Sequence, residues 1–260
     1  YYMNYTDFLA NANLYDGYKR PDTHPRDYYE VFVGEYSANS EIVRSPKSQE
    51  DTRYRYIENS WITALSEAAM MTGFERNGDI VKLAAYAPMF GNLARMNQWP
   101  VNMMFFNSTD VVLTPNYYVQ QLFMQNSGDH KLDSTVSFAS GSAPQTTYNG
   151  VKGTTAVTRT LDDFYYVASA DEETGDLIVK IVNAGATEMK LNLNVGVTGT
   201  KLKGTAKITV LQNRKSDAVS TLEGSAIYPY SSVVNGFTNG NTLGVTVEPY
   251  SVTAVRIRTN

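Results

Sequence analysis

The hydrophobic pattern of this chain changes its period near the middle, and that change constrains the fold more than any other feature. In the first half, segments of helical periodicity alternate with short apolar runs, whereas in the second half apolar and polar residues alternate with a period of two. The second half also lacks Trp and is rich in Thr, Val and Gly. We therefore predict two domains, residues 1–127 and 128–260, that join at the polar turn cluster of residues 126–129.

The first half predicts the order of elements found in a parallel βα array. Helices are expected over residues 6–17, 59–73, 79–87 and 115–125, and buried strands over residues 29–36 and 101–107. Two strands cannot form such a sheet alone, so we expect the other strands to lie upstream of residue 1. The start without Met fits a chain that is a piece of a longer protein.

The second half predicts an antiparallel β-sandwich. Strands of alternating pattern, separated by Gly, Asn and Asp turns, are expected over residues 164–170, 176–183, 188–195, 206–211, 243–247 and 251–258. The predicted fold class is thus α/β followed by all-β.

The composition excludes several classes of function. The chain has no Cys, which excludes disulfides, zinc–thiolate sites and thiol nucleophiles, and its two His residues leave little for a metal centre. A net charge of −4 argues against nucleic-acid binding, and no run of 18 apolar residues could span a membrane. The 19 Tyr residues suit a saccharide site, and equally the core of a β-sandwich.

Glu35 is the strongest candidate for a catalytic residue. It stands at the end of the apolar strand predicted over residues 29–36, and barrel enzymes carry their catalytic groups at the carboxyl ends of their strands. Gly34 beside it leaves room for a ligand or a neighbouring strand. These few residues alone fit equally well a strand-terminal Glu that bonds a nearby Arg.

A second candidate segment combines amides with aromatic rings. Gln98 can donate to and accept from sugar hydroxyls, and Trp99 offers a face on which a sugar ring can stack. The local sequence somewhat favours the other interpretation, in which Trp99 and Phe90 pack at the top of a barrel.

Several motifs then occur together in one order. They are FVGEY at 32–36, ALSEAA at 64–69, TGFERN at 72–77, AYAPMF at 85–90, TPNYYVQ at 114–120 and EPYSV at 248–252. With this set the chain resembles the C-terminal half of α-L-arabinofuranosidases of glycoside hydrolase family 51. The resemblance is dense over residues 1–126 and is carried mostly by pattern beyond them.

The resemblance implies the last part of a (β/α)8 barrel followed by a jelly-roll-like β-sandwich. Residues 29–36 would be barrel strand seven, residues 101–107 strand eight, and Tyr1-Tyr2 the end of strand six. We therefore expect strands seven and eight to be parallel neighbours, with an unpaired edge where strand six belongs. Such an edge is open to pairing with another chain, so an oligomer fits this interpretation.

The resemblance also implies roles for individual residues. The family is retaining, Glu35 matches its nucleophile, and Tyr1 or Tyr2 matches the donor that keeps this carboxylate charged. Gln98 and Trp99 become candidates for contacts with the sugar, and neither a metal nor an organic cofactor is required.

The acid/base residue of the family has no counterpart in this sequence. In the family it is the Glu of an Asn-Glu pair after strand four, and Glu30, Glu41 and Glu67 do not match that pair. We expect the acid/base residue on the preceding part of the barrel, and this chain alone to be inactive.

The implied substrate is a polysaccharide or oligosaccharide with terminal α-L-arabinofuranosyl units, which favours an extracellular or periplasmic location over the cytoplasm. Two other functions stay open at this point. One is a non-catalytic carbohydrate-binding or structural module built on the sandwich. Its sugar contacts would come from tyrosines in place of Trp, namely Tyr165, Tyr166, Tyr228 and Tyr230. The other is a related barrel glycosidase with a different glycone, such as a β-glucanase or a β-xylosidase.

Overall fold

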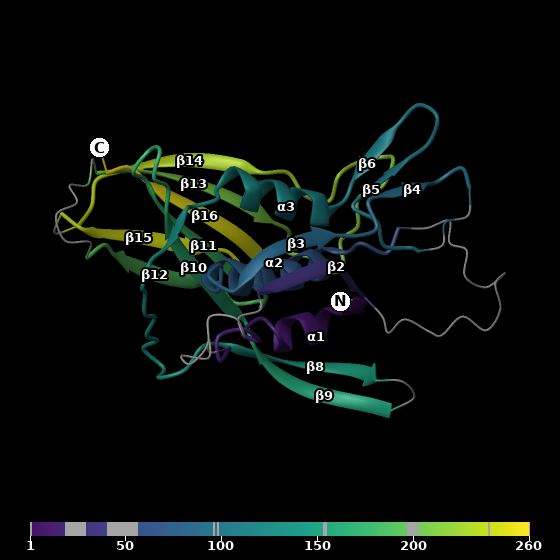
Figure 1. The fold of residues 1–260 in the computed structure, drawn as a ribbon, viewed down its shortest axis with the longest axis horizontal. Coiled ribbons are helices and arrows are strands. Elements are labelled where there is room, and N and C mark those ends of the chain that lie inside the picture. Colours follow the sequence, from purple (N-terminus) through teal and green to yellow (C-terminus); the bar gives the residue numbers. More distant parts are fainter. Residues whose placement is uncertain are drawn as a thin grey trace.

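A computed structural model gives the fold of most of the chain. It describes residues 2–18, 30–40, 57–95, 97, 99–152, 155–196, 202, 204–238 and 240–259. Over these residues the chain is mostly β-structure with few helices, and its elements divide into a small parallel sheet, three helices and a larger antiparallel part (Figure 1).

A parallel sheet of three strands, in the order β1-β2-β3, carries the candidate site. It consists of β1 (Tyr2–Asn4), β2 (Val31–Asn39) and β3 (Val81–Tyr86). Both pairings are parallel, with Tyr2 opposite Ser37 and Val33 opposite Ala84. Strand β1 occupies the place expected for the end of strand six, and it forms the edge of this sheet within the described part of the chain.

The structure corrects two sequence predictions here. Residues 79–87 were expected to form a helix, but they contain β3, which is the parallel neighbour of β2. The run VKLAAY fits either a short strand or a helical segment by its apolar pattern, and the turn over residues 77–80 that looked like a helix cap leads into a strand instead.

The strand predicted over residues 101–107 is therefore not the neighbour of β2. Only β5 (Met104–Phe106) forms there, in a separate small sheet between β4 (Phe90–Asn92) and β6 (Val111–Leu113). Both partners of β5 are close to it in the sequence, and the apolar run alone does not show which strands will pair with it. Figure 1 shows β4–β6 beyond the ends toward which β2 and β3 run.

The predicted antiparallel strands of the second half are confirmed, and the structure adds several. A six-stranded sheet among the described residues has the order β14-β13-β16-β11-β10-β7. These strands are β7 (His130–Lys131), β10 (Phe164–Ala170), β11 (Leu177–Asn183), β13 (Thr205–Gln212), β14 (Tyr230–Asn235) and β16 (Ser251–Ile257). Two further pairs are β12 (Met189–Asn194) with β15 (Thr242–Val247), and β8 (Gln145–Lys152) with β9 (Thr155–Asp162).

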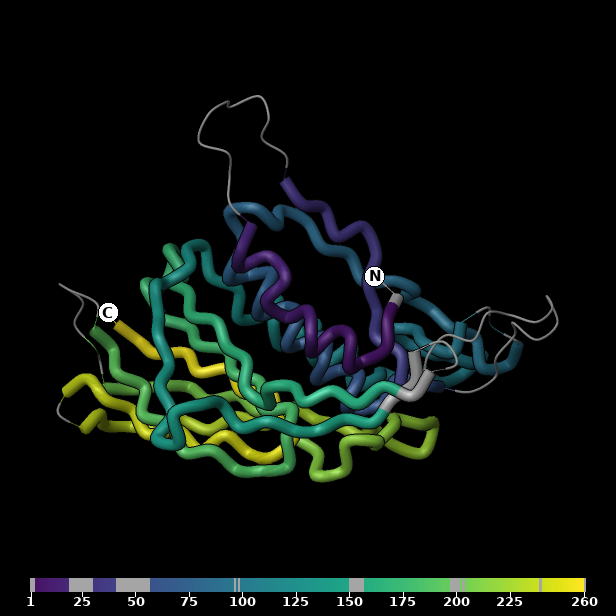
Figure 2. The backbone as a smooth tube through the Cα atoms, turned by 90° about the horizontal axis from the view of Figure 1, so that it is seen from below, coloured from purple at the N-terminus to yellow at the C-terminus, as the bar shows by residue number. Residues whose placement is uncertain are grey.

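Helix α2 (Trp61–Arg76) lies between the two sheets and is buried on nearly all sides. It packs against β2 and β3, against β10, β11 and β16, and against the helices α1 (Tyr5–Ala10) and α3 (Pro115–Gln125). Figure 2 shows α1 and α2 lying over one side of the larger sheet. One hydrophobic cluster thus joins both halves of the chain, with Leu65 and Phe74 of α2 in the same cluster as Tyr165 and Val252. The division at residues 127/128 stays a prediction.

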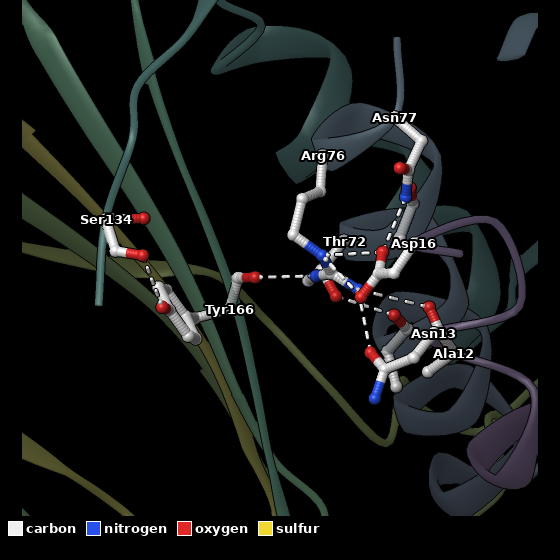
Figure 3. A network of polar contacts seen from close by, with 10 residues as sticks. Ala12, Asn13, Asp16, Thr72, Arg76, Asn77, Ser134 and Tyr166 are labelled. Carbon is white, nitrogen blue, oxygen red and sulfur yellow. Dashed lines mark hydrogen bonds and ion pairs between the residues drawn. The ribbon is translucent and has the colours of Figure 1, made fainter. Parts of the chain in front are cut away.

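The last turn of α2 fixes the chain around it. A Cβ atom on Gly73 would lie 2.0 Å from the carbonyl oxygen of Ala12, so only glycine permits this close approach. The Arg76 guanidinium donates to Asp16, to Asn13 and to the carbonyl oxygen of Tyr166 on β10 (Figure 3). Arg76 therefore ties the segment after α1 to the larger sheet.

The neighbouring Glu75 makes a second link between α2 and the larger sheet. It pairs with Lys180 of β11, whose side chain is buried and also donates to the carbonyl oxygen of Phe123 at 3.3 Å. The Lys180 ammonium lies 4.8 Å from the centre of the Phe123 ring. Burial lowers the pKa of Lys180, and the carboxylate of Glu75 opposes that shift. Because the Lys180 charge would otherwise be buried alone, its contacts with Glu75 and Phe123 hold α2 and α3 against β11.

Glu67, in the middle of α2, is a fully buried carboxyl group. Burial raises its pKa to about 8, while the backbone N–H of Ala38 and the nearby Asn116 amide act in the opposite direction. The folded protein therefore keeps the Glu67 proton up to about pH 8, whereas the unfolded chain releases it near its ordinary pKa of about 4.5.

We predict that Gly73→Ala destabilises the protein by about 2–3 kcal/mol, because the added methyl group collides with backbone that cannot move alone. In a helix without this contact the same change would be stabilising. The measurement is the midpoint of thermal or urea unfolding. Gly78→Ala is the matched control, since a Cβ there lies 3.4 Å from its nearest neighbour, and it should leave the midpoint almost unchanged.

We also predict that Glu67 makes stability fall as the pH rises from 4.5 to 8, because folding takes up a proton over that range. The contribution is at most about 1.4 kcal/mol per pH unit. Glu67→Gln cannot titrate, so its unfolding midpoint relative to the unchanged protein should rise steadily with pH. All other titrating groups are common to both proteins, so their effects cancel in the difference between the two midpoints. A difference that is constant from pH 5 to pH 8 would contradict the buried neutral acid.

Candidate functional site

The strand that carries Glu35 has a bulge at this residue. Val33 pairs with Ala84 and Tyr36 pairs with Tyr86, so two residues of β2 oppose a single residue of β3 at this point. Bulges re-aim side chains and are common next to active sites. Gly34 and Glu35 are the two residues of the bulge.

The bulge places two exposed residues of β2 between two buried ones. Val33 and Tyr36, three positions apart, both reach the core against α2, whereas Gly34 and Glu35 between them are exposed. In a regular strand, residues three positions apart point to opposite faces, so it is the extra residue of the bulge that lets Val33 and Tyr36 share one face. Glu35 is thus held at the surface by buried residues on both sides of it in the chain.

The exposed face also carries two large apolar side chains. Phe32 and Leu83 are paired residues of β2 and β3 and are 64% and 62% exposed. The Phe32 ring lies 3.8 Å from the position that a Cβ on Gly34 would take, so Gly34 lies next to that ring. A carboxylate and apolar groups share this side of the parallel sheet.

The position of Glu35 along the strand differs from the sequence expectation. Strand β2 does not end at residue 36 but continues to Asn39, where it pairs with β1. It is β3 that ends here, at Tyr86 opposite Tyr36. Glu35 therefore lies inside its own strand and beside the carboxyl end of the next one, because β2 gains a second partner that the sequence pattern did not show.

Tyr36 anchors the residue after Glu35 in the core. Its ring packs edge-on against Phe74 and Tyr86, and its hydroxyl group hydrogen-bonds with the side-chain amide of Gln120 on α3 at 2.8 Å. Burial is the main cause that raises the pKa of Tyr36, so its hydroxyl stays neutral.

Glu67 anchors β2 three residues beyond Glu35. Its Oε1 atom accepts a hydrogen bond of 2.8 Å from the backbone N–H of Ala38. Its other oxygen, Oε2, is buried and has no hydrogen-bond partner among the described residues. A carboxylate in that position is costly, which agrees with the raised pKa of Glu67.

A chain of buried amides leads from the end of β3 to the segment that contains Trp99. The Asn59 side chain donates to the hydroxyl of Tyr86 at 3.2 Å and to Asn116 Oδ1 at 3.1 Å. Asn59 Oδ1 accepts from the backbone N–H of Asn102 at 3.0 Å, and the Asn102 amide donates to the carbonyl oxygen of Trp99 at 2.9 Å. The backbone of Trp99 is thus held by core residues, while its side chain is 41% exposed.

The remaining predicted site residues are placed as follows. Tyr1 and Gln98 lie outside the described residues, and only the backbone of Tyr2 is described, in β1 opposite Ser37. None of these residues is therefore tested as a sugar contact.

The tyrosines that were considered as alternative sugar contacts differ in exposure. Tyr165 is buried in the core, and Tyr166 is half-buried. Tyr228 and Tyr230 are exposed, and the ring of Tyr228 lies 6.1 Å from that of Tyr118.

Sequence reasoning missed Glu67 and the amides of Asn59 and Asn116 as parts of this site. A signal for Glu67 was available, since it is the one acidic residue within the Ala-rich run ALSEAA of a helix that has no polar face. For the two asparagines no such signal exists, because their partners are distant in sequence.

The described residues show neither a metal-binding cluster nor a membrane-spanning helix. They contain no group of three or more His, Cys, Asp and Glu side chains that could hold a metal ion. They also contain no helix that is long and apolar enough to cross a membrane.

The chain is similar to part of the sequence of several α-L-arabinofuranosidases. It is 37% identical over 190 residues to an extracellular exo-α-L-arabinofuranosidase of Streptomyces chartreusis, which covers 67% of this chain and 20% of that protein. It is 30% identical over 244 residues to a probable α-L-arabinofuranosidase A of Aspergillus flavus, covering 92% of this chain and 31% of that protein. The chain therefore spans a fifth to a third of the length of these relatives.

A solved structure supports the same relationship. The arabinose-bound MgGH51 α-L-arabinofuranosidase superimposes with a TM-score of 0.76 and 27% identity, over 100% of this chain and 36% of that one. The family model of the α-L-arabinofuranosidase C-terminal domain matches residues 34–251. The match begins at the bulge of β2 and ends at the first residue of β16, so it includes α2, α3 and the strands between them and β16, but not β1 or α1. The chain belongs to the α-L-arabinofuranosidase C-terminal domain family.

Proposed function

We propose that this chain is part of a retaining α-L-arabinofuranosidase and supplies its nucleophile, Glu35. The observation that carries the proposal is the placement of Glu35 on an exposed bulge of a parallel sheet, in a chain whose relatives are named α-L-arabinofuranosidases. A nucleophile must reach the anomeric carbon and must be held still, and the buried neighbours Val33 and Tyr36 supply the second condition.

The proposal treats the parallel sheet as the last part of a (β/α)8 barrel. In this assignment β1, β2 and β3 are strands six, seven and eight, with β3 in place of residues 101–107. Parallel pairing on both sides of β2 supports it. The exposed Phe32 and Leu83 support it too, since the inward side chains of a barrel pack on those of other strands. Those strands would come from residues that precede this chain.

The reaction follows from the chemistry of paired carboxyl groups. Glu35 attacks the anomeric carbon of a terminal α-L-arabinofuranosyl unit, the bond to the leaving oxygen breaks, and a glycosyl ester forms on Glu35. A second carboxyl group, about 5–5.5 Å away, protonates the leaving oxygen and then activates the water that hydrolyses the ester. We place that second group outside this chain. Glu67 cannot take the role because it is fully buried.

The substrate contacts and location are parts of the same proposal. Trp99, with its backbone held by Asn102 and its side chain partly exposed, is suited to stack on a sugar ring at the end of β3. Tyr1, Tyr2 and Gln98 are proposed as further contacts. An arabinose-containing glycan is the proposed substrate, and an extracellular location is supported by the name of the Streptomyces relative.

We predict that Glu35→Ala, in the complete enzyme, loses several orders of magnitude in kcat on 4-nitrophenyl α-L-arabinofuranoside. An activated leaving group needs no protonation, but it still needs a nucleophile. Added azide should restore turnover from the vacated side and give an arabinofuranosyl azide of inverted configuration.

Glu30→Ala is the matched control for this experiment. Glu30 is an exposed carboxylate just before β2 that contacts Lys82 at 4.0 Å, so its loss should leave kcat almost unchanged. Substantial activity of Glu35→Ala without azide, or an azide product of retained configuration, would show that Glu35 is not the nucleophile.

A further inference from the structure

The hydrogen bonding of β2 changes just beyond Glu35. The carbonyl oxygen of Tyr36 accepts from the N–H of Ala87 at 3.3 Å, so the backbone polar groups of Tyr36 face β3. In a parallel sheet every second residue of a strand faces the same neighbour, so the N–H of Ala38 faces this side as well. Strand β3 has already ended at Tyr86, and it offers Ala38 no strand partner.

Glu67 takes the place of the missing strand at this point. Its Oε1 atom accepts the Ala38 N–H at 2.8 Å, and both residues are fully buried. A buried N–H without an acceptor is costly, so this contact fixes β2 from the side opposite β1, within the stretch beyond the bulge that pairs with β1. A carboxyl group in the fully buried middle of a helix is an expensive way to satisfy one N–H, which points to a role for the position of this strand.

We propose that Glu67 is a positioning residue for Glu35, which it holds in place by anchoring β2 immediately beyond the bulge. This inference rests on the proposed function of Glu35. Glu67 itself is fully buried and cannot touch a substrate.

The surroundings of Glu67 connect it with the second candidate contact. Asn116, whose amide lies near the Glu67 carboxyl, is bonded to Asn59, and Asn59 accepts the N–H of Asn102. The same group of core residues therefore reaches the strand of Glu35 on one side and the backbone of Trp99 on the other.

The test is a double-mutant cycle in the complete enzyme with 4-nitrophenyl α-L-arabinofuranoside. Glu67→Met keeps the volume and the helix propensity of the side chain but removes the acceptor for Ala38. We expect kcat to fall about 100-fold with little change in KM, since a displacement of about 1 Å costs that much in catalysis. Glu67→Gln keeps a carbonyl oxygen for Ala38 and should restore kcat to within a few-fold of the unchanged enzyme.

The second arm of the cycle separates positioning from general damage. In Glu35→Ala the added azide replaces the carboxylate, so the position of Glu35 no longer matters. Glu67→Met should then lower the azide-dependent rate no more than a few-fold. An equal loss in both backgrounds would overturn the proposal, because Glu67 would then act on the whole enzyme rather than through Glu35.

Two controls complete the experiment. Ser66→Ala removes a neighbouring buried hydroxyl whose partner among the described residues lies within α2, the carbonyl oxygen of Thr63, and should leave kcat unchanged. If Glu67→Met does not fold, Glu67→Asp withdraws the carboxyl from Ala38 by one methylene and must show the same dependence on background. A Glu35→Ala enzyme that keeps its activity contradicts the proposed function itself, which distinguishes that failure from a failure of the positioning role.

Discussion

The contact between Gly73 of α2 and the carbonyl oxygen of Ala12 is the constraint on which the rest of the structure depends. It brings the segment after α1 against the last turn of α2, where Arg76 bonds that segment to β10 and Glu75 pairs with Lys180 of β11. One helical turn thus sets how the parallel sheet and the antiparallel sheet lie relative to each other. Because α2 is buried between them, both sheets contribute residues to one hydrophobic cluster around this helix.

The candidate site also depends on α2, but on contacts of its middle as well as of its last turns. The middle of α2 supplies Glu67, which bonds β2 beyond the bulge, while Tyr36 packs against Phe74 near its end. The catalytic proposal for Glu35 therefore does not rest on an isolated exposed carboxylate. Glu35 is exposed because its neighbours on both sides are tied to a helix that the larger sheet holds in place.

Local sequence patterns predicted the elements that form through local interactions. The predictions were wrong where residues distant in the sequence determine the structure. Helix α3 was predicted over its full length, since Thr114-Pro115 marks its start and the cap hydrogen bond is local. Strand β3 was predicted as a helix, because VKLAAY has no strong preference and only the neighbouring β2 makes it a strand. The prominence of Glu35 came from its motif, but the bulge and the continuation of β2 to Asn39 could not be read from the sequence, because they follow from pairing with β1 and β3.

The central claim is that Glu35 forms the covalent intermediate, and peptide mapping after covalent labelling tests it most directly. The complete enzyme would be inactivated with a cyclophellitol-type arabinofuranosyl inhibitor, digested, and searched for the modified peptide by mass spectrometry. Our account predicts a single ester-linked label on the peptide that contains Val33-Gly34-Glu35-Tyr36. A label on another carboxylate, with this peptide unmodified, would contradict it.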